Sequence, residues 1–330
     1  MPNARIIGTG MYVPERLVTN DEMTKIVDTS DEWIRERSGI QERHFISEEC
    51  GASDLALEAT KIALKNAKMT ADEIDFIIFA TLSPDYNFPG SGVLLQDKLG
   101  LKNIGALDVR NQCSGFVYGL SVANAYIRAG LYKNILLVGA EVHSTGLDFS
   151  DEGRHIAVLF GDGAGAVIIS ATDEERGVLS THLHSDGSKA LELCLINPGS
   201  RKIPRYYEGI WEDGTLYPHM NGREVFKYAV TLFPRVINEA LETNGYSTED
   251  IDLLIPHQAN MRITEAIAHR LKLRPDQYFS NIHKYGNTTA ASIPIALHEA
   301  IEEGRVKDNS LVILAAFGSG FTWASAAIRW

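Results

Sequence analysis

The segment TADEIDFIIFA (residues 70–80) has a near copy further along the chain, STEDIDLLIPH (247–257). A second pair follows in the same order, AGLYKNILLVGAE (129–141) and EGRVKDNSLVILAAF (303–317). Ile74 aligns with Ile251 at an offset of 177, and Gly130 aligns with Gly304 at an offset of 174. Two matches in order predict a duplicated unit. We therefore expect an N-terminal half over residues 1–172 and a C-terminal half over residues 173–330.

The units are of the α/β class, because short apolar runs alternate with amphipathic stretches along the whole chain. The pattern predicts strands over 4–12, 74–81, 104–109, 133–141, 164–171, 177–185, 251–255, 310–317 and 321–329. It predicts helices over 53–67, 91–99, 114–129, 222–243, 260–272 and 288–303. The glycine-rich GDGAGAVIIS (161–170) opens a strand and not a helix, so close backbone packing explains it better than a nucleotide site.

Composition excludes several classes of protein. A formal net charge of −12 argues against a nucleic-acid binder, which needs a basic face. No apolar run approaches the roughly 20 residues that span a bilayer, and the N-terminus shows no signal peptide. Three widely spaced cysteines (Cys50, Cys113, Cys194) do not suggest disulfides, and no metal-binding motif is present. We expect a cytoplasmic protein.

Cys113 stands in RNQCSGFVYGL (110–120), directly before a predicted helix. The N–H groups and dipole of a helix start favour a thiolate, the nucleophile of thioester exchange. A single cysteine is more often buried and inert. At the offset of 174, Cys113 aligns with Asn287, which also precedes a predicted helix. Two halves related by a pseudo-two-fold axis would bring these helix starts together, although Asn287 alone reads as a helix cap.

His257 lies in LLIPHQAN (253–260), immediately after a predicted buried strand. The ends of such strands are where α/β folds place functional groups. The other nine of the ten histidines lack a comparable setting. Taken alone, His257 is better explained as a hydrogen-bonded residue near the core.

Six motifs together resemble the β-ketoacyl-acyl carrier protein synthase III family: TSDEWIRERSGIQERH (29–44), CSGF (113–116), VLFGDGAGAV (158–167), PHQAN (256–260), YGNTTAASIP (285–294) and AFGSGFTWASAAIRW (316–330). They extend over nearly the whole chain. The resemblance implies the thiolase fold, in which two similar halves form five αβαβα layers. That fold agrees with the internal repeat.

The resemblance also implies a reaction. Cys113 would take the acyl group of an acyl-CoA, and malonyl-acyl carrier protein would then lose CO2 to give an enolate that attacks it. His257 and Asn287 would donate to the enolate oxygen as neutral groups. The backbone N–H groups of Cys113 and Ser319 would form an oxyanion hole. The family is homodimeric and uses no cofactor, the acyl-CoA being a substrate.

Further residues match family positions that contact the substrates. Trp33, Arg37 and Arg154 would bind the adenine and phosphates of CoA, and Gly222 and Asn260 would line the pantetheine tunnel. Arg262, Lys227 and Arg270 would form a local basic patch for the acidic carrier protein. Ordinary solvated charge explains Lys227 and Arg270 nearly as well.

Phe317 and Phe88 match family positions of the acyl pocket. In the family, the residue at the Phe88 position reaches from the dimer interface toward the partner's pocket, and a bulky side chain there favours a short primer such as acetyl. The segment 197–222 is longer than usual for the family, and its aromatic residues form either a lid or a surface cover.

Two related activities of the same fold match this sequence less well. The C-terminal AAFGSGF lacks the second cysteine of degradative thiolases, and Asn287 stands where elongating synthases carry a second histidine. Both features indicate an initiating enzyme. A specialised condensing acyltransferase, of secondary metabolism or for long-chain acyl thioesters, is the same-fold alternative. A cysteine-dependent thioester hydrolase is the alternative of another class, and it would gain nothing from Asn287.

Overall fold

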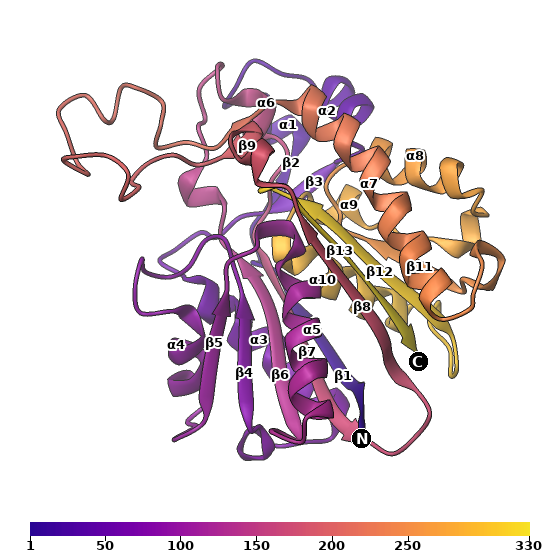
Figure 1. Ribbon diagram of the computed structural model, residues 1–330. Helices are drawn as coiled ribbons and strands as arrows, with labels where there is room; N and C mark the ends of the chain where they lie inside the picture. Colours follow the sequence, from indigo (N-terminus) through magenta and orange to yellow (C-terminus); the bar gives the residue numbers. More distant parts are fainter.

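The computed structural model describes residues 1–330, and its two main sheets are each built from one half of the chain (Figure 1). The first sheet has the order β1-β7-β6-β4-β5, with β1 (Asn3–Tyr12), β4 (Phe76–Ala80), β5 (Gly105–Val109), β6 (Asn134–Glu141) and β7 (Gly163–Thr172). The second has the order β11-β12-β13-β8, with β8 (Gly177–Ser185), β11 (Leu253–Pro256), β12 (Leu311–Gly318) and β13 (Thr322–Arg329). All nine predicted strands are present.

The two sheets share one topology. In the first sheet β1 is antiparallel to β7, β7 is antiparallel to β6, and β6 is parallel to β4. In the second, β8 is antiparallel to β13, β13 is antiparallel to β12, and β12 is parallel to β11. The same order and the same directions are what a duplicated unit requires.

Helices complete five layers. The outer face of the first sheet is covered by α3 (Ala52–Ala67) and α4 (Ser91–Lys98), and that of the second by α7 (Gly222–Thr243) and α8 (Met261–Leu271). Between the sheets lie α5 (Gly115–Arg128) and α10 (Ser292–Glu302). The six predicted helices are these six. The arrangement is the αβαβα order that the resemblance implied. None of the helices combines the length and the apolarity that a bilayer crossing needs.

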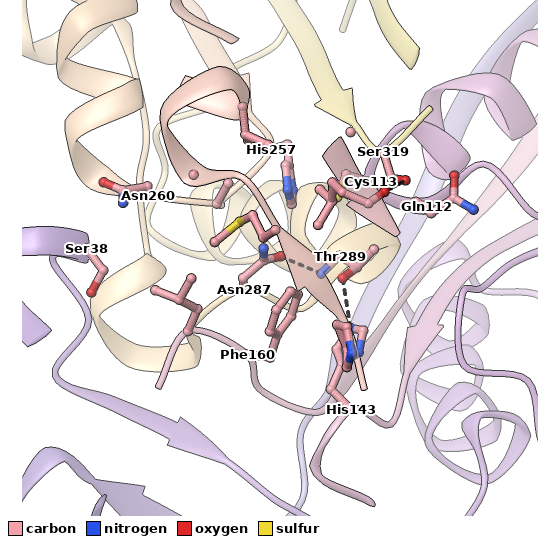
Figure 2. Close-up of a pocket in the computed structure, with 18 of the residues that line it drawn as sticks. Ser38, Gln112, Cys113, His143, Phe160, His257, Asn260, Asn287, Thr289 and Ser319 are labelled. Atoms are coloured by element: carbon pink, nitrogen blue, oxygen red, sulfur yellow. Dashed lines mark hydrogen bonds between the residues drawn. The ribbon is translucent and has the colours of Figure 1, made fainter. Parts of the chain in front are cut away.

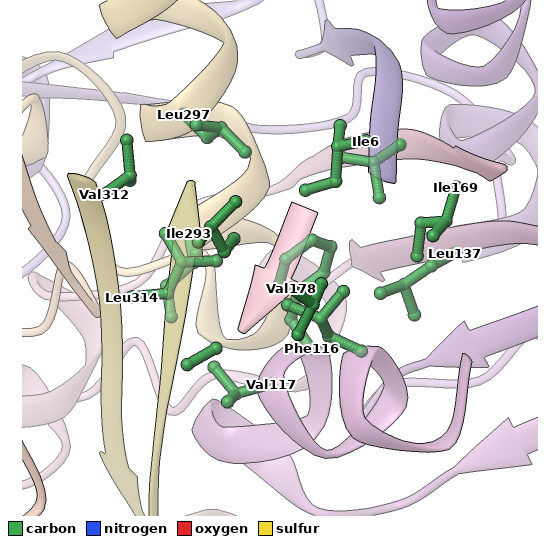
Figure 3. Packing of buried hydrophobic residues seen from close by; sticks show 14 of the residues in the cluster. Ile6, Phe116, Val117, Leu137, Ile169, Val178, Ile293, Leu297, Val312 and Leu314 are labelled. Carbon is green, nitrogen blue, oxygen red and sulfur yellow. The ribbon is translucent and has the colours of Figure 1, made fainter. Parts of the chain in front are cut away.

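The central layer holds the largest buried cluster, of 28 residues. Figure 3 shows Phe116 and Val117 of α5 beside Ile293 of α10, with side chains of both sheets around them, among them Leu137, Ile169, Val312 and Leu314. These side chains are at most 1% exposed. Apolar burial of this kind is the main force that holds the two sheets on the two central helices.

Gly165, in the glycine-rich segment, explains why α10 sits so close to the first sheet. A Cβ added to Gly165 would lie 2.7 Å from Cβ of Pro294 and 2.8 Å from the backbone nitrogen of Ile295. No larger residue fits there. The structure therefore supports close backbone packing as the reason for this segment.

The alignment of Cys113 with Asn287 is wrong by three residues. α5 has 14 residues and α10 has 11, so an offset of 174 applies only at their C-terminal ends. At their starts, Gly115 and Ser292, the offset is 177, and the same offset relates the 3-10 turns η2 (Gln112–Ser114) and η7 (Thr289–Ala291). The counterpart of Cys113 is thus Ala290. The two helix starts do meet, since η2 packs against η7.

Several short elements lie outside the predicted pattern, because tertiary contacts and caps stabilise them more than apolar periodicity does. They are β2 (Leu17–Thr19), α1 (Asn20–Met23), α2 (Asp31–Ser38), β3 (Glu42–His44), α6 (Arg154–Ala157), β9 (Leu193–Cys194), β10 (His219–Met220) and α9 (Ile282–Tyr285). Most of them pack around a separate buried cluster of 11 residues. The segment between β9 and β10 projects from the body of the molecule as a long loop (Figure 1).

Candidate active site

A cavity of about 910 Å³ is lined by Cys113, His257 and Asn287 together (Figure 2). Cys113 comes from the turn before α5, His257 follows β11, and Asn287 lies between α9 and η7. The cavity wall therefore draws on both halves of the chain. The structure brings Cys113 to one site with His257 and Asn287, which lie 144 and 174 residues further along the chain.

Cys113 is 7% exposed, and its pKa is raised, whereas its place before a helix predicted a lowered one. Burial, and after it the charge of Glu141, raises the pKa of the Cys113 thiol to about 12. The backbone N–H groups of Cys113 and Ser319 act in the other direction. The resting group is therefore a neutral thiol, because loss of hydration outweighs the helix start.

Gly318 allows the end of β12 to approach the nucleophile. A Cβ at Gly318 would lie 2.8 Å from Cβ of Cys113 and 3.1 Å from its backbone nitrogen. This contact brings the next N–H, that of Ser319, to the Cys113 sulfur. Two backbone N–H groups that converge on the point of attack are the arrangement of an oxyanion hole.

His257 presents a neutral ring to the cavity. Its backbone N–H donates to the carbonyl of Ala315 on β12 at 2.8 Å. The residue is 3% exposed, and burial lowers the pKa of the imidazole to about 3. Nδ1 lies 2.6 Å from Oγ of Ser292, whereas Nε2 has no protein partner and is not enclosed by protein atoms. Nε2 therefore faces the cavity.

The orientation of the Asn287 amide is fixed by its neighbours. Its backbone N–H donates to the carbonyl of Leu159 at 2.8 Å. Its Oδ1 accepts the N–H of Thr289 at 2.9 Å, a bond drawn in Figure 2. Because a backbone N–H can only donate, the atom it meets is the amide oxygen. The Nδ2 group has no protein partner and is not enclosed, so it is directed into the cavity.

His143 also lines this cavity and was not among the residues predicted from the sequence. Its Nε2 lies 2.7 Å from Oγ of Thr289, and its ring packs on Phe160 with centroids 4.8 Å apart. Burial lowers the pKa of His143 to about 3, as for His257. The available signal was its position, since it follows the buried strand β6 almost as directly as His257 follows β11.

The outer part of the cavity carries most of the predicted CoA residues. Trp33 and Arg37 lie one turn apart on α2. The helix is capped by Ser30, whose side chain accepts the Trp33 N–H at 3.1 Å. The Arg37 guanidinium lies 4.7 Å from the Trp33 ring centroid. Asn260 donates to the Arg37 carbonyl at 2.7 Å and, like Gly222, lines the cavity. A cation beside an aromatic face is a suitable surface for a phosphate-bearing adenine.

Arg154 lies next to this group, in a smaller hollow that it shares with Trp33, where it pairs with Asp28 at 2.8 Å. Of the predicted basic patch, only Arg262 lines the main cavity. Lys227 is exposed and lies 3.5 Å from Glu224, and Arg270 donates to the carbonyl of Val230.

The two acyl-pocket candidates differ. Phe317 is 4% exposed and lines the cavity, whereas Phe88 is 84% exposed and does not reach the cavity of its own chain. In the long segment 197–222, Trp211 is 77% exposed, and neither it nor the three tyrosines line the cavity. In this chain the aromatic residues of the segment therefore form no lid over the site.

Comparisons with known proteins agree with this geometry. Residues 107–187 match the model of the 3-oxoacyl-[acyl-carrier-protein (ACP)] synthase III family, and residues 241–330 match that of its C-terminal part. The β-ketoacyl-[acyl-carrier-protein] synthase III of Xanthomonas campestris pv. campestris is 51% identical over 327 residues, which cover 99% of this chain and 98% of that protein. The corresponding protein of Caldanaerobacter subterraneus is 45% identical, with the same coverage of both chains.

The chain belongs to the β-ketoacyl-acyl carrier protein synthase III family.

The crystal structure of the family member from Aquifex aeolicus has a TM-score of 0.91 to this chain at 43% identity, and it covers 99% of this chain and 100% of its own. The fold of this synthase is therefore the α/β thiolase-like fold, as the motifs predicted. A β-ketoacyl-acyl carrier protein synthase III is a condensing acyltransferase that initiates fatty acid synthesis. Acyl-CoA and malonyl-acyl carrier protein are the substrates that membership implies.

Proposed function

We propose that Cys113, His257 and Asn287 carry out the condensation in two half-reactions, with a short acyl-CoA such as acetyl-CoA as the primer. One observation carries the proposal. Two neutral donors, His257 Nε2 and Asn287 Nδ2, are directed into the same cavity as the Cys113 thiol. A thiol that accepts an acyl group and two donors that do not release protons match the needs of an enolate reaction.

In the first half-reaction the Cys113 sulfur attacks the thioester carbonyl of the acyl-CoA. The carbonyl oxygen gains negative charge and accepts hydrogen bonds from the N–H groups of Cys113 and Ser319. The bond to the CoA sulfur then breaks, and the thiol proton leaves with CoA. Trp33, Arg37 and Arg154 hold the nucleotide end, and Gly222 and Asn260 border the pantetheine arm.

In the second half-reaction malonyl-acyl carrier protein occupies the vacated tunnel. Loss of CO2 leaves an electron pair on the α-carbon, with negative charge on the thioester oxygen. His257 and Asn287 donate to that oxygen. The carbanion attacks the acyl thioester on Cys113, and the carbon–sulfur bond breaks. A β-ketoacyl-carrier protein leaves, and the Cys113 thiolate takes a proton from solvent water to regain its thiol form.

The test separates the two half-reactions. Radiolabelled acetyl-CoA should label the parent enzyme and not Cys113→Ala. Cys194→Ala is the matched control, because Cys194 lines the same cavity and should not be needed. His257→Ala and Asn287→Ala should keep the label and lose release of CO2 from malonyl-carrier protein by about 100- to 1000-fold.

His143→Ala is the control for His257→Ala, since both imidazoles are buried, neutral and on one cavity wall. Equal labelling of the parent and Cys113→Ala would overturn the nucleophile assignment. Free acid as the main product would support the hydrolase alternative. A panel of acyl-CoA primers from acetyl to long and branched chains identifies the primer, and preference for long chains would support the specialised condensing enzyme.

We also propose that the acidic carrier protein docks beside the outer part of the cavity. Arg262 is exposed there and contacts the ring of Phe226, with its guanidinium 5.6 Å from the centroid. Lys227 and Arg270 extend the positive surface along α7 and α8. Because net charge is −12, such a patch must act locally. Arg262→Glu should raise KM for malonyl-carrier protein and leave KM for acetyl-CoA less affected.

We infer a homodimer from the edge of the first sheet. β5 is an edge strand and is only half-buried, whereas its neighbour β4 is fully buried. Tyr86, Phe88 and Val93, from the segment before α4 and from α4 itself, are exposed. An unpaired strand edge beside exposed apolar side chains favours pairing with a second copy. Phe88 would then reach the partner's cavity, and Phe88→Asp should shift the protein to a monomer in sedimentation analysis.

Two further assignments belong to the same proposal. The chain divides into residues 1–172, which carry Cys113, and 173–330, which carry His257 and Asn287, since each part contains one complete sheet. A cytoplasmic location is consistent with three free cysteines.

A further inference from the structure

Ser292 lies behind the His257 ring and outside the cavity lining. It is the first residue of α10 and is 2% exposed. Its hydroxyl oxygen lies 2.6 Å from His257 Nδ1 and accepts the backbone N–H of Gln258 at 3.3 Å. These two are the hydrogen-bond partners of the Ser292 side chain.

The two partners determine where the protons lie. A serine hydroxyl has one proton to donate and two lone pairs to offer. The Gln258 N–H can only donate, so it occupies one lone pair of Ser292 Oγ. His257 Nδ1 is then the acceptor for the hydroxyl proton. If Nδ1 carried the ring proton instead, the hydroxyl proton would be buried without an acceptor, which disfavours that arrangement by about 10- to 100-fold.

We propose that Ser292 is a positioning residue, which holds His257 in the tautomer that carries its proton on Nε2, the nitrogen that faces the cavity. The inference rests on the proposed function of His257 as a donor to the enolate. A neutral imidazole has only one N–H, so the wrong tautomer would present a lone pair to the enolate oxygen. The hydrogen bond from Ser292 removes that tautomer.

A consequence is that Ser292 serves only one half-reaction. Transfer of the acyl group to Cys113 uses the backbone N–H groups of Cys113 and Ser319 and does not involve the His257 proton. Decarboxylation requires the Nε2 proton in place as charge develops. Ser292 therefore acts through His257 on the second half-reaction and leaves the first unchanged.

The experiment compares Ser292→Ala, Ser292→Thr and a control, Ser325→Ala. Ser325 is also fully buried, and it donates to the Val236 carbonyl at 2.7 Å, so its loss imposes a similar structural cost without touching His257. Ser292→Ala should accept label from acetyl-CoA within about threefold of the parent rate. It should release CO2 from malonyl-carrier protein about 10- to 100-fold more slowly, in kcat more than in KM. Ser292→Thr keeps the hydroxyl and should restore most of the rate.

The 15N chemical shifts of the histidine ring nitrogens report the tautomer directly, and a purely structural role of Ser292 would leave them unchanged. The signals that disappear in His257→Gln identify the ring. In the parent they should show a protonated Nε2 and an unprotonated Nδ1. In Ser292→Ala the preference for this tautomer should weaken. A protonated Nδ1 in the parent would overturn the inference. So would full decarboxylation by Ser292→Ala, or a parallel loss of both half-reactions there and in Ser325→Ala.

The two proposals can fail separately. If His257→Ala retains decarboxylation, the proposed function of His257 is wrong. If His257→Ala loses it while Ser292→Ala keeps it, only the positioning by Ser292 is wrong.

Discussion

Asn287→Asp tests whether negative charge develops on the substrate next to the Asn287 side chain. The change is nearly isosteric, and the Thr289 N–H that holds Oδ1 at 2.9 Å is a backbone group that remains. The carboxylate should therefore keep the position of the amide. Its second oxygen would replace Nδ2, so an acceptor with negative charge would face the enolate where a donor stood.

The expected loss has two parts. Removal of one donor costs about 100- to 1000-fold in rate. Two charges about 4 Å apart at an effective dielectric constant of about 20 repel by about 4 kcal/mol, which is a further factor of about 1000. The ionised variant should therefore release CO2 at about 10⁻⁵ to 10⁻⁶ of the parent rate. Asn287→Ala loses only the donor and should retain far more activity.

The pH dependence sharpens the test. Burial raises the pKa of a carboxyl group, and a protonated carboxyl can donate a hydrogen bond. The activity of Asn287→Asp should thus rise as the pH falls from about 8.5 to 5.5, because more of the side chain is neutral. The rate of CO2 release by the parent should not change over this pH range, since the amide does not titrate and the pKa of His257 is about 3.

The assay is release of labelled CO2 from malonyl-carrier protein, with acylation of Cys113 by acetyl-CoA as the control. Acylation should lose only the part that comes from charge repulsion, because the Asn287 donor is not needed for that step. If Asn287→Asp released CO2 at pH 8 as fast as Asn287→Ala, no charge would develop beside this residue and the enolate reasoning would be refuted.

Three further outcomes are expected. Gly318→Ala should destabilise the protein by about 1–3 kcal/mol and slow labelling of Cys113 more than tenfold. Gly187→Ala should do neither, because a Cβ at Gly187 meets nothing within 4 Å. Equal labelling of the two variants would contradict the close contact between Gly318 and Cys113. Alkylation of Cys113 by iodoacetamide should accelerate about tenfold per pH unit from pH 7 to 10, and a plateau near pH 8 would show that the thiol pKa is not raised. Burial lowers the pKa of His143 to about 3 in the folded state, so the neutral ring stabilises the fold above the unfolded pKa of about 6.5. Below that pH the free energy of unfolding should decrease, by about 2 kcal/mol between pH 7 and 5. Urea unfolding of His143→Gln should show a decrease smaller by that amount, and an unchanged decrease would disprove the reasoning.

The sequence predicted the strands, the long helices and the shared topology, because buried strands and amphipathic helices have characteristic periodicities. It also predicted that Cys113, His257 and Asn287 would share a site, through motifs that resemble a family. It did not predict α2, whose eight residues depend on the Ser30 cap and on the left-handed Gly39 at its end.

The misses at the site itself depend on three-dimensional contacts. Burial raises the pKa of the Cys113 thiol, against the thiolate expected from its helix start, because a sequence does not show how completely a helix start is desolvated. The alignment with Asn287 was wrong because α10 is three residues shorter than α5. His143 and Ser292 belong to the site through contacts with Thr289 and His257, and no local sequence pattern indicates those pairs.

The contact between η2 and η7 places the starts of two long helices at one point. The start of each helix is equivalent to roughly half a positive charge, so the fields of α5 and α10 converge on the space between Cys113 and Asn287. In the proposed reaction, negative charge develops there on the sulfur, on the tetrahedral oxygen of each half-reaction and on the enolate oxygen. The same desolvation that keeps the resting thiol neutral also strengthens a fixed field acting on each transient anion. A single arrangement of dipoles can thus favour several charged species in succession.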